Sequence, residues 1–192
     1  VCGTVSEAKH MLENTTVTDT KFSDSLPPSP LHWMISDKES SIVIESTKKG
    51  TEIFDNPFGV LTNSPNFLYH KTHICDFLSL SNSNPQTILY KFEDFSFFSD
   101  GYGARLLPGD FSSSSRFVRG AFASRFTSYG ESEDDEINSF FHVMETVSIP
   151  KGCVTDSEGK EKYTLYTSAI DAEKKLYRFH TYERRDIAVF SL

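Results

Sequence analysis

The order of the expected secondary-structure elements constrains the fold more than any other feature of this sequence. Short runs rich in β-branched and aromatic residues, separated by turn residues such as Gly50, predict strands at residues 31–36, 41–45, 51–54 and 59–61. Helical patterns follow, and three more strands are expected at residues 163–170, 176–183 and 187–190. The order is strands, helices, strands, without βαβ alternation. It predicts an α+β fold with antiparallel sheets, in a single domain of residues 1–192.

Four helices are expected from apolar periodicity and from capping residues. A helix at residues 5–12 has Ser6 as its candidate cap, and one at residues 66–78 has Asn66. The other two cover residues 113–126 and residues 134–147, the latter opening on acidic side chains that complement its dipole. Residues 79–115 form a long loop region with weak strands near residues 88–92, and loops of this length are usually functional or assembly elements.

Composition excludes several classes of function. The net charge of −8 argues against a nucleic-acid or anionic-membrane partner, and no apolar run approaches the roughly 18 residues of a membrane span. The three cysteines Cys2, Cys75 and Cys153 contain no C-x-x-C pair, which argues against a disulfide framework or a zinc site and favours a reducing, cytoplasmic setting. The chain has no signal-peptide pattern, and its start at Val rather than Met indicates processing or truncation.

The segment DNPFGVLTNSPNF at residues 55–67 is the most informative stretch for function. Two turn-forming segments bracket the short apolar strand at residues 59–61, and this arrangement is expected to hold Asn63 at the rim of a sheet. A carboxamide fixed there can donate a hydrogen bond to a molecule bound in a cleft. From the residues alone, a plain turn residue is the more common role for such an asparagine.

Four segments, in the same order, resemble the choloylglycine hydrolase family, which contains conjugated bile acid hydrolases and penicillin V acylases. They are LHWMISD at 31–37, the segment at residues 55–67, LPGDFSSSSRFVR at 107–119 and YTLYTS at 163–168. The resemblance implies the αββα sandwich of N-terminal nucleophile hydrolases, with antiparallel sheets. It covers nearly the whole chain but only the later part of the family pattern. The fold is therefore expected to be incomplete on its amino-terminal side.

The resemblance also implies a chemistry and two site residues. Such enzymes cleave an amide with an N-terminal cysteine whose free α-amine relays the proton. The match at residues 61–63 implies that Asn63 donates to the oxyanion, and the match at residues 115–117 implies that Arg116 lies beside the nucleophile. The alternative for Arg116 is a surface residue at a helix start, paired with Asp110. No cofactor and no metal is implied.

The nucleophile itself has no counterpart in the sequence. Cys2 is rejected because Val1 acylates its α-nitrogen and because the residues after it do not match the family's opening strand. Cys75 and Cys153 are expected to be buried or loop thiols. The resemblance favours hydrolysis of glycine- or taurine-conjugated bile acids, with this chain inactive alone. Penicillin V acylase specificity, or a non-catalytic truncated chain or subunit, are the alternatives, and a homo-oligomer is left open.

Other patterns are weaker. His70 and His73 have the spacing of a helical metal pair but lack further ligands in sequence, so a core or solvated role is expected. Residues 100–103 (DGYG) predict a turn rather than a phosphate loop. The dense aromatics at residues 92–98 are expected to line an apolar pocket of bile-acid size or to contact a neighbouring subunit.

Overall fold

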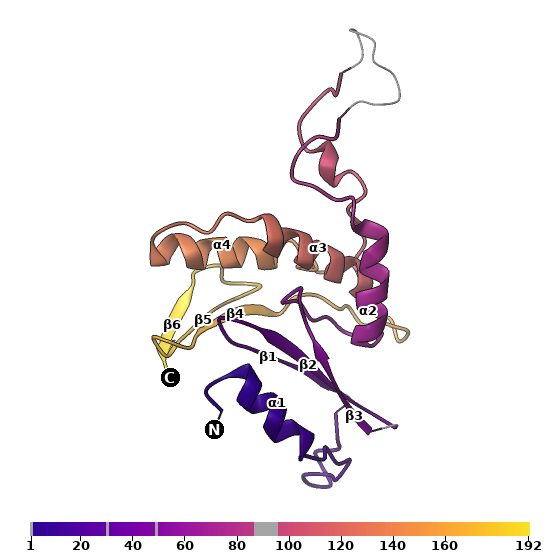
Figure 1. Ribbon diagram of the computed structural model, residues 1–192, viewed down its shortest axis with the longest axis vertical. Helices are drawn as coiled ribbons and strands as arrows, with labels where there is room; N and C mark the ends of the chain where they lie inside the picture. Colours follow the sequence, from indigo (N-terminus) through magenta and orange to yellow (C-terminus); the bar gives the residue numbers. More distant parts are fainter. Residues whose placement is uncertain (1, 30, 49, 87–95) are drawn as a thin grey trace. The chain divides into compact units, whose positions relative to one another are not determined.

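The computed structural model describes residues 2–29, 31–48, 50–86 and 96–192. The chain divides into two compact units, Val1–Leu78 (the first unit) and Ser79–Leu192 (the second unit). Each unit combines helices with one antiparallel sheet of three strands (Figure 1). The α+β class is therefore confirmed, while the single domain of residues 1–192 stays a prediction.

The first unit is built on an antiparallel meander. Its strands are β1 (His32–Ser36), β2 (Ser41–Thr47) and β3 (Gly50–Asp55), with β2 in the centre. Ile42 and Ile44 point from β2 toward helix α1 (Val5–Glu13) and form a buried cluster with Val5. The helix begins two residues earlier than a Ser6 cap would allow. Thr4 is the cap, and its side chain accepts a hydrogen bond from the main-chain nitrogen of Glu7.

The opposite face of the first sheet packs against α2 (Phe67–His73). Val43 and Glu45 point to this side, and the ring of Phe54 meets the fully buried ring of Phe67 at a centroid distance of 5.9 Å. Asn66 caps α2 as expected, accepting from the main-chain nitrogen of Tyr69. The helix is shorter than predicted and continues as the 3₁₀ turn η1 (Ile74–Phe77).

The prediction of a strand at residues 59–61 is wrong, because those residues have irregular backbone. Gly59 has φ of 61°, which lies in the left-handed region and ends any extended run. The side chain of Asn56 then closes a local loop. It donates to the main-chain oxygen of Val60 at 3.1 Å and accepts from the main-chain nitrogen of Phe58 at 3.2 Å. Local side-chain bonding therefore replaces the sheet ladder here.

The second unit places two helices on one sheet. Helix α3 (Ser113–Phe126) has the predicted bounds, and α4 (Glu133–Glu145) begins one residue earlier than predicted because Ser132 caps it. The sheet contains β4 (Tyr166–Asp171), β5 (Leu176–Thr181) and β6 (Ala188–Ser191) in that order. The expected hairpin between the last two strands is confirmed. A 3₁₀ turn, η2 (Tyr102–Ala104), precedes the helices.

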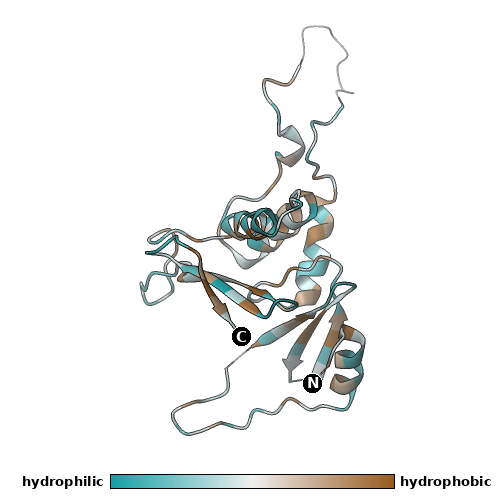
Figure 2. Cartoon of the chain, turned by 90° about the vertical axis from the view of Figure 1, so that its left-hand side faces the viewer, coloured by the Kyte–Doolittle hydropathy of each residue, from teal (hydrophilic) through white to brown (hydrophobic). Residues whose placement is uncertain are grey.

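The two faces of the second sheet differ. Thr167, Ala169, Arg178 and His180 are buried on the side that meets α4, where the rings of Phe141 and His180 are 5.2 Å apart. Tyr166, Ile170 and Phe190 are exposed on the other side. Figure 2 shows hydrophobic and hydrophilic bands along the strands. Alternation with a period of two residues accounts for this pattern.

Two further expectations about elements need comment. Residues 163–165 do not belong to β4, because Thr164 exchanges hydrogen bonds with Ile149 in the preceding loop. The weak strands expected near residues 88–92 lie outside the described residues. The turn expected at residues 100–103 is confirmed, with Gly101 at φ of 89° ahead of η2. No helix in the described ranges is both long and apolar enough to cross a bilayer.

Candidate functional site

Asn63 lies in the irregular segment between β3 and α2, and its side chain is exposed. The main-chain oxygen of Asn63 is 3.0 Å from Nε2 of His70, which reaches it from the middle of α2. The carboxamide is therefore carried on a loop whose backbone is tied to a buried side chain. An exposed carboxamide on such a loop can offer its N–H groups to a bound oxygen atom.

The start of α2, close after Asn63, is fixed to the first sheet by Glu45. This side chain is buried on β2, and its Oε1 accepts from the main-chain nitrogen of Phe67 at 2.9 Å. The same oxygen lies 3.2 Å from Nδ1 of His32 on the neighbouring strand. A carboxylate at a helix N-terminus satisfies a free amide and complements the helix dipole. The sheet, the helix and the Asn63 loop are thus connected through side chains.

Arg116 lies in the first turn of α3 and is partly buried. Its main-chain nitrogen donates to the oxygen of Ser112, the helix cap. Burial lowers the pKa of the guanidinium, and the neighbouring positive charge of Arg119 lowers that pKa further. Since an arginine still carries its charge at neutral pH, Arg116 presents a partly desolvated cation. Such a cation depresses the pKa of a thiol placed beside it.

Asp110 organises the turn that leads into α3. Its Oδ1 accepts from the main-chain nitrogen of Ser112 at 2.8 Å, and its Oδ2 accepts from the hydroxyl of Ser115 at 2.5 Å. Hydrogen bonds from the side chains of Ser112 and Ser115, followed by the main-chain bond from Ser112, lower the pKa of Asp110 to about 2. Asp110 is therefore ionised at neutral pH, and its charge is used to fix the start of the helix.

Arg119, one helical turn after Arg116, is buried and holds three main-chain oxygens. Its Nε donates to Thr146 at 2.8 Å, and its Nη1 donates to Pro108 at 2.9 Å and to Asp110 at 2.6 Å. Burial lowers the pKa of Arg119, and the charge of Asp110 partly opposes this effect. Arg119 thereby ties α3 both to the turn before it and to the end of α4.

The two residues expected to form the site lie in different units. Asn63 belongs to the first unit and Arg116 to the second. Each is placed by its own local network, through His70 in one unit and through the Ser112 and Asp110 turn in the other. The meeting of the two side chains around a shared reaction centre stays a prediction.

The cysteines and the two histidines of α2 differ in their exposure. Cys2 is partly buried, whereas Cys75 in η1 and Cys153 are exposed, so of the two alternatives expected for Cys75 and Cys153, buried or loop thiols, burial does not occur. His70 is buried and bonded to the Asn63 loop, while His73 is only partly buried and its Nδ1 lies 3.8 Å from Asp76. No group of three or more metal-ligating side chains occurs among the described residues.

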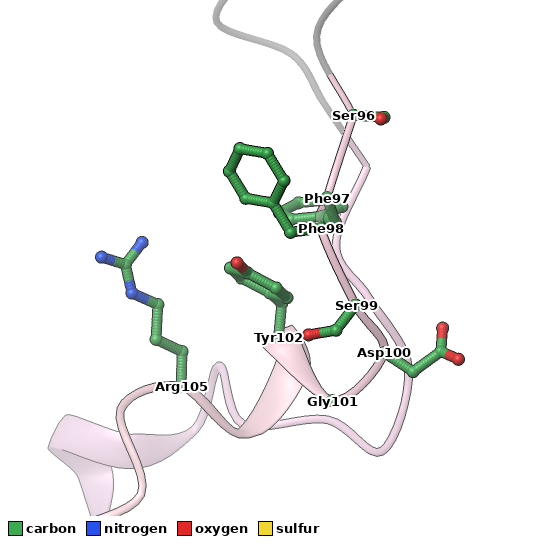
Figure 3. A pocket seen from close by; sticks show the side chains of 8 residues that line it. All are labelled: Ser96, Phe97, Phe98, Ser99, Asp100, Gly101, Tyr102 and Arg105. Carbon is green, nitrogen blue, oxygen red and sulfur yellow. The ribbon is translucent and has the colours of Figure 1, made fainter.

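A hollow of about 590 Å³ lies on the loop before η2. Figure 3 shows the rings of Phe97 and Phe98 beside Tyr102, with Arg105 close to them. The rings of Phe97 and Tyr102 are 4.7 Å apart, whereas Phe98 is 99% exposed. This loop contains the end of the aromatic run at residues 92–98; residues 92–95 lie outside the described part. The aromatic pocket and the subunit contact both stay predictions.

Sequence reasoning missed the residues that support the two candidates. Glu45 and Arg119 contact main-chain atoms up to 22 and 27 residues away, and His70 contacts one that is 7 residues away across an irregular segment. No local spacing reveals such contacts. For Arg119, the signal was its position one helical turn after Arg116, which places it on the same side of α3. For Glu45, the signal was a charged residue at the end of an apolar strand.

The sequence matches, over residues 1–192, the family described as linear amide C–N hydrolases, choloylglycine hydrolase family. A bile salt hydrolase/transferase of Lactiplantibacillus plantarum is 42% identical over 188 residues, which cover 98% of this chain and 58% of that protein. The chain belongs to the choloylglycine hydrolase family. The resemblance inferred from the four segments is thereby confirmed.

Solved structures of choloylglycine hydrolase relatives agree with this assignment. A variant of the conjugated bile acid hydrolase from Clostridium perfringens superposes with a TM-score of 0.87 at 34% identity, over 99% of this chain and 58% of that one. The penicillin V acylase from Agrobacterium tumefaciens, 23% identical, has a TM-score of 0.72 over 100% of this chain and 52% of that one and shows the fold alone. These likenesses confirm the expected fold class, the α+β fold of N-terminal nucleophile hydrolases. The chain spans a little over half the length of these relatives.

Proposed function

We propose that this chain is part of an amidase that separates bile acids from conjugated glycine or taurine. The observation that supports this most directly is the 42% identity, across 98% of the chain, to a protein named bile salt hydrolase/transferase. The family description, linear amide C–N hydrolases, names the same kind of bond.

In this proposal Asn63 and Arg116 have separate roles. The Asn63 carboxamide donates a hydrogen bond to the oxyanion that forms when the amide carbonyl is attacked, and such a donor is worth about 2.7–4 kcal/mol in comparable sites. The Arg116 guanidinium lies beside the attacking sulfur and favours its thiolate form. The partly desolvated cation of Arg116 and the exposed carboxamide of Asn63 suit these roles.

The nucleophile in this proposal is an N-terminal cysteine supplied by another part of the protein. Its thiolate attacks the amide carbonyl, its α-amine transfers a proton to the leaving glycine or taurine nitrogen, and water then cleaves the thioester. Cys2 does not take this role, because Val1 precedes it and its nitrogen is an amide. We therefore expect the chain of 192 residues to have no turnover alone.

Penicillin V is the alternative substrate, favoured by the fold shared with the acylase from Agrobacterium tumefaciens. Both substrates present a linear amide to the same donor and cation, so the proposed roles of Asn63 and Arg116 do not distinguish them. A non-catalytic role for the chain is the other alternative. We rank the bile acid conjugate first because of the sequence identity to bile salt hydrolases.

The test combines the chain with a separately produced amino-terminal portion of a family member. Glycocholate, taurocholate and penicillin V are each supplied, and the released amine or free acid is quantified by mass spectrometry. We expect turnover of the bile acid conjugates in the mixture and none with either part alone. Asn63→Ala should lower kcat by about 10²–10³, while the exposed Asn138→Ala control should leave it unchanged.

Three results would contradict the proposal. Turnover by the chain alone that Cys2→Ala abolishes would assign the nucleophile to Cys2. Faster release from penicillin V than from glycocholate would reverse the ranking of substrates. Asn63→Ala and Arg116→Ala could also leave the rate of hydrolysis in the mixture unchanged, equal to the rate of Arg125→Ala, an exposed control on the same helix as Arg116. That result would mean that neither residue belongs to the site.

A further inference from the structure

We propose that His70 is the positioning residue that holds the Asn63 carboxamide in its working orientation. This inference rests on the proposed role of Asn63 and adds a residue to it. His70 has 0% exposure, although its ring carries two polar nitrogens. A histidine is rarely buried so completely without a specific hydrogen bond, because a buried polar group that lacks one is costly.

The hydrogen bond in question ends on the backbone of Asn63. Nε2 of His70 is 3.0 Å from the main-chain oxygen of Asn63 and 3.4 Å from Oγ1 of Thr62. A carbonyl oxygen can only accept, so Nε2 carries the hydrogen. The ring therefore acts as a donor that reaches back from α2 to the preceding loop, and it fixes the peptide plane that follows Asn63.

The helix that carries His70 is itself rigidly placed. Phe67, at its first position, has 0% exposure, packs on Phe54 of the sheet and donates its main-chain N–H to the buried carboxylate of Glu45 at 2.9 Å. His70 follows Phe67 by one turn and lies on the same buried side. The position of the Asn63 carbonyl is thus set by the first sheet, through α2.

Fixing this carbonyl also limits the side chain of Asn63. The carbonyl carbon and the side chain are bonded to the same Cα. A backbone held in one conformation allows only a few staggered side-chain rotamers. An oxyanion donor acts mainly through preorganisation, so it loses effect when its carrier loop becomes mobile. His70 touches neither substrate nor nucleophile in this scheme and acts only through Asn63.

The first experiment uses the chain as it is and needs no catalytic activity. The carbonyl carbon and side-chain amide signals of Asn63 are followed by NMR, with Asn63→Ser used to assign them. His70→Phe keeps a ring but removes the donor, and His70→Gln retains a donor N–H on a flexible side chain. His73→Gln is the matched control on the same helix, at a partly buried position.

We expect the Asn63 carbonyl signal to shift upfield and its amide signals to broaden in His70→Phe. His70→Gln should restore most of both, and His73→Gln should change neither. Unchanged Asn63 signals in His70→Phe would overturn the proposal. A general loss of the first unit's signals in His70→Phe that His70→Gln does not reverse would also overturn it, because His70 would then be only a core residue.

The second experiment uses the complemented enzyme described above. We expect His70→Phe to lower kcat by about tenfold to a hundredfold with KM little changed, as displacement of a catalytic group does. His70→Gln should recover most of the rate. Unchanged kcat with shifted Asn63 signals would overturn the role of His70 in the reaction. Absence of hydrolysis in any mixture would count against the proposed function, while the NMR result would still decide whether His70 orients Asn63.

Discussion

The hydroxyl of Ser115, the residue immediately before Arg116, donates a hydrogen bond of 2.5 Å to Oδ2 of Asp110. Oδ1 of the same carboxylate accepts from the main-chain nitrogen of Ser112, the cap of α3. One ionised side chain therefore closes the turn from both sides. The position of Arg116 depends on this closure, since Arg116 lies in the first turn of the helix.

The stability of the second unit should depend on pH through Asp110. Its pKa is about 2 in the folded chain, against an ordinary value of roughly 3.9 when unfolded. A depressed folded pKa contributes stability that is present above the unfolded pKa and is lost as pH falls through the folded one. Urea unfolding followed by far-UV circular dichroism should show this loss between about pH 4 and pH 2.

Asp110→Asn should flatten that part of the pH profile. Asp186→Asn, at an exposed position in the turn between β5 and β6, makes the same charge change and should keep the wild-type slope. Equal slopes in Asp110→Asn and in the wild type would mean that the carboxylate does not stabilise the turn.

Truncating Arg119 should destabilise the second unit by about 3 kcal/mol, because Arg119→Ala leaves three main-chain oxygens without their donor. Arg119→Lys should recover only part of this loss, since an ammonium cannot reproduce the planar fork. Arg125→Ala, at an exposed position on the same helix, should change the unfolding free energy by no more than about 0.5 kcal/mol. A similar small change in Arg119→Ala would show that these bonds exchange freely with water.

Glu45 should matter for the first unit through the start of α2. Glu45→Ala removes the acceptor for the main-chain nitrogen of Phe67 and should cost about 2 kcal/mol of unfolding free energy. Glu45→Gln keeps an oxygen at Oε1 and should cost less. Trp33 on β1 is the sole tryptophan of the sequence, so its fluorescence reports on this unit during urea unfolding. Glu52→Ala, on the adjacent strand but exposed, is the control.

Lys174 and Arg178 both pair with Glu133, yet their removal should have different effects. Lys174 is half exposed, so solvent screens its ion pair, and Lys174→Ala should lower stability only slightly, and less at high salt. Arg178 is buried against α4, and Arg178→Ala should cost about 3 kcal/mol, since an ion pair with one desolvated member is broken. Thermal unfolding at low and high salt separates the two. Equal losses would mean that burial of Arg178 adds nothing.

Where residues act on their own helix or strand, the sequence predicted the structure well. The bounds of α3 are as expected because Ser112 caps it and Thr127 ends it with extended backbone. Elsewhere the predicted elements or caps were wrong because polar side chains form hydrogen bonds with nearby main-chain atoms. Asn56 closes a loop where a strand was expected, and Thr4 caps α1 in place of Ser6. Competition between nearby polar side chains for the same amides is not encoded in periodicity.

For the candidate site, the sequence predicted the two functional residues but not the side chains that position them. Resemblance to a family predicts Asn63 and Arg116, whereas for His70 the sequence indicates only a core or solvated role. The contact between His70 and Asn63 spans an irregular turn and depends on where Phe67 seats α2 on the sheet. Such a contact follows from tertiary packing, which no local pattern of polar and apolar residues specifies.

The exposed side of the second sheet has a practical consequence. Tyr166, Ile170 and Phe190 present apolar surface there in the folded chain. An environment-sensitive dye such as anilinonaphthalene sulfonate should therefore fluoresce with the native protein before any heating. Dye-based melting curves of this chain would start from a high baseline, so ligand screening by that method should be replaced with calorimetry.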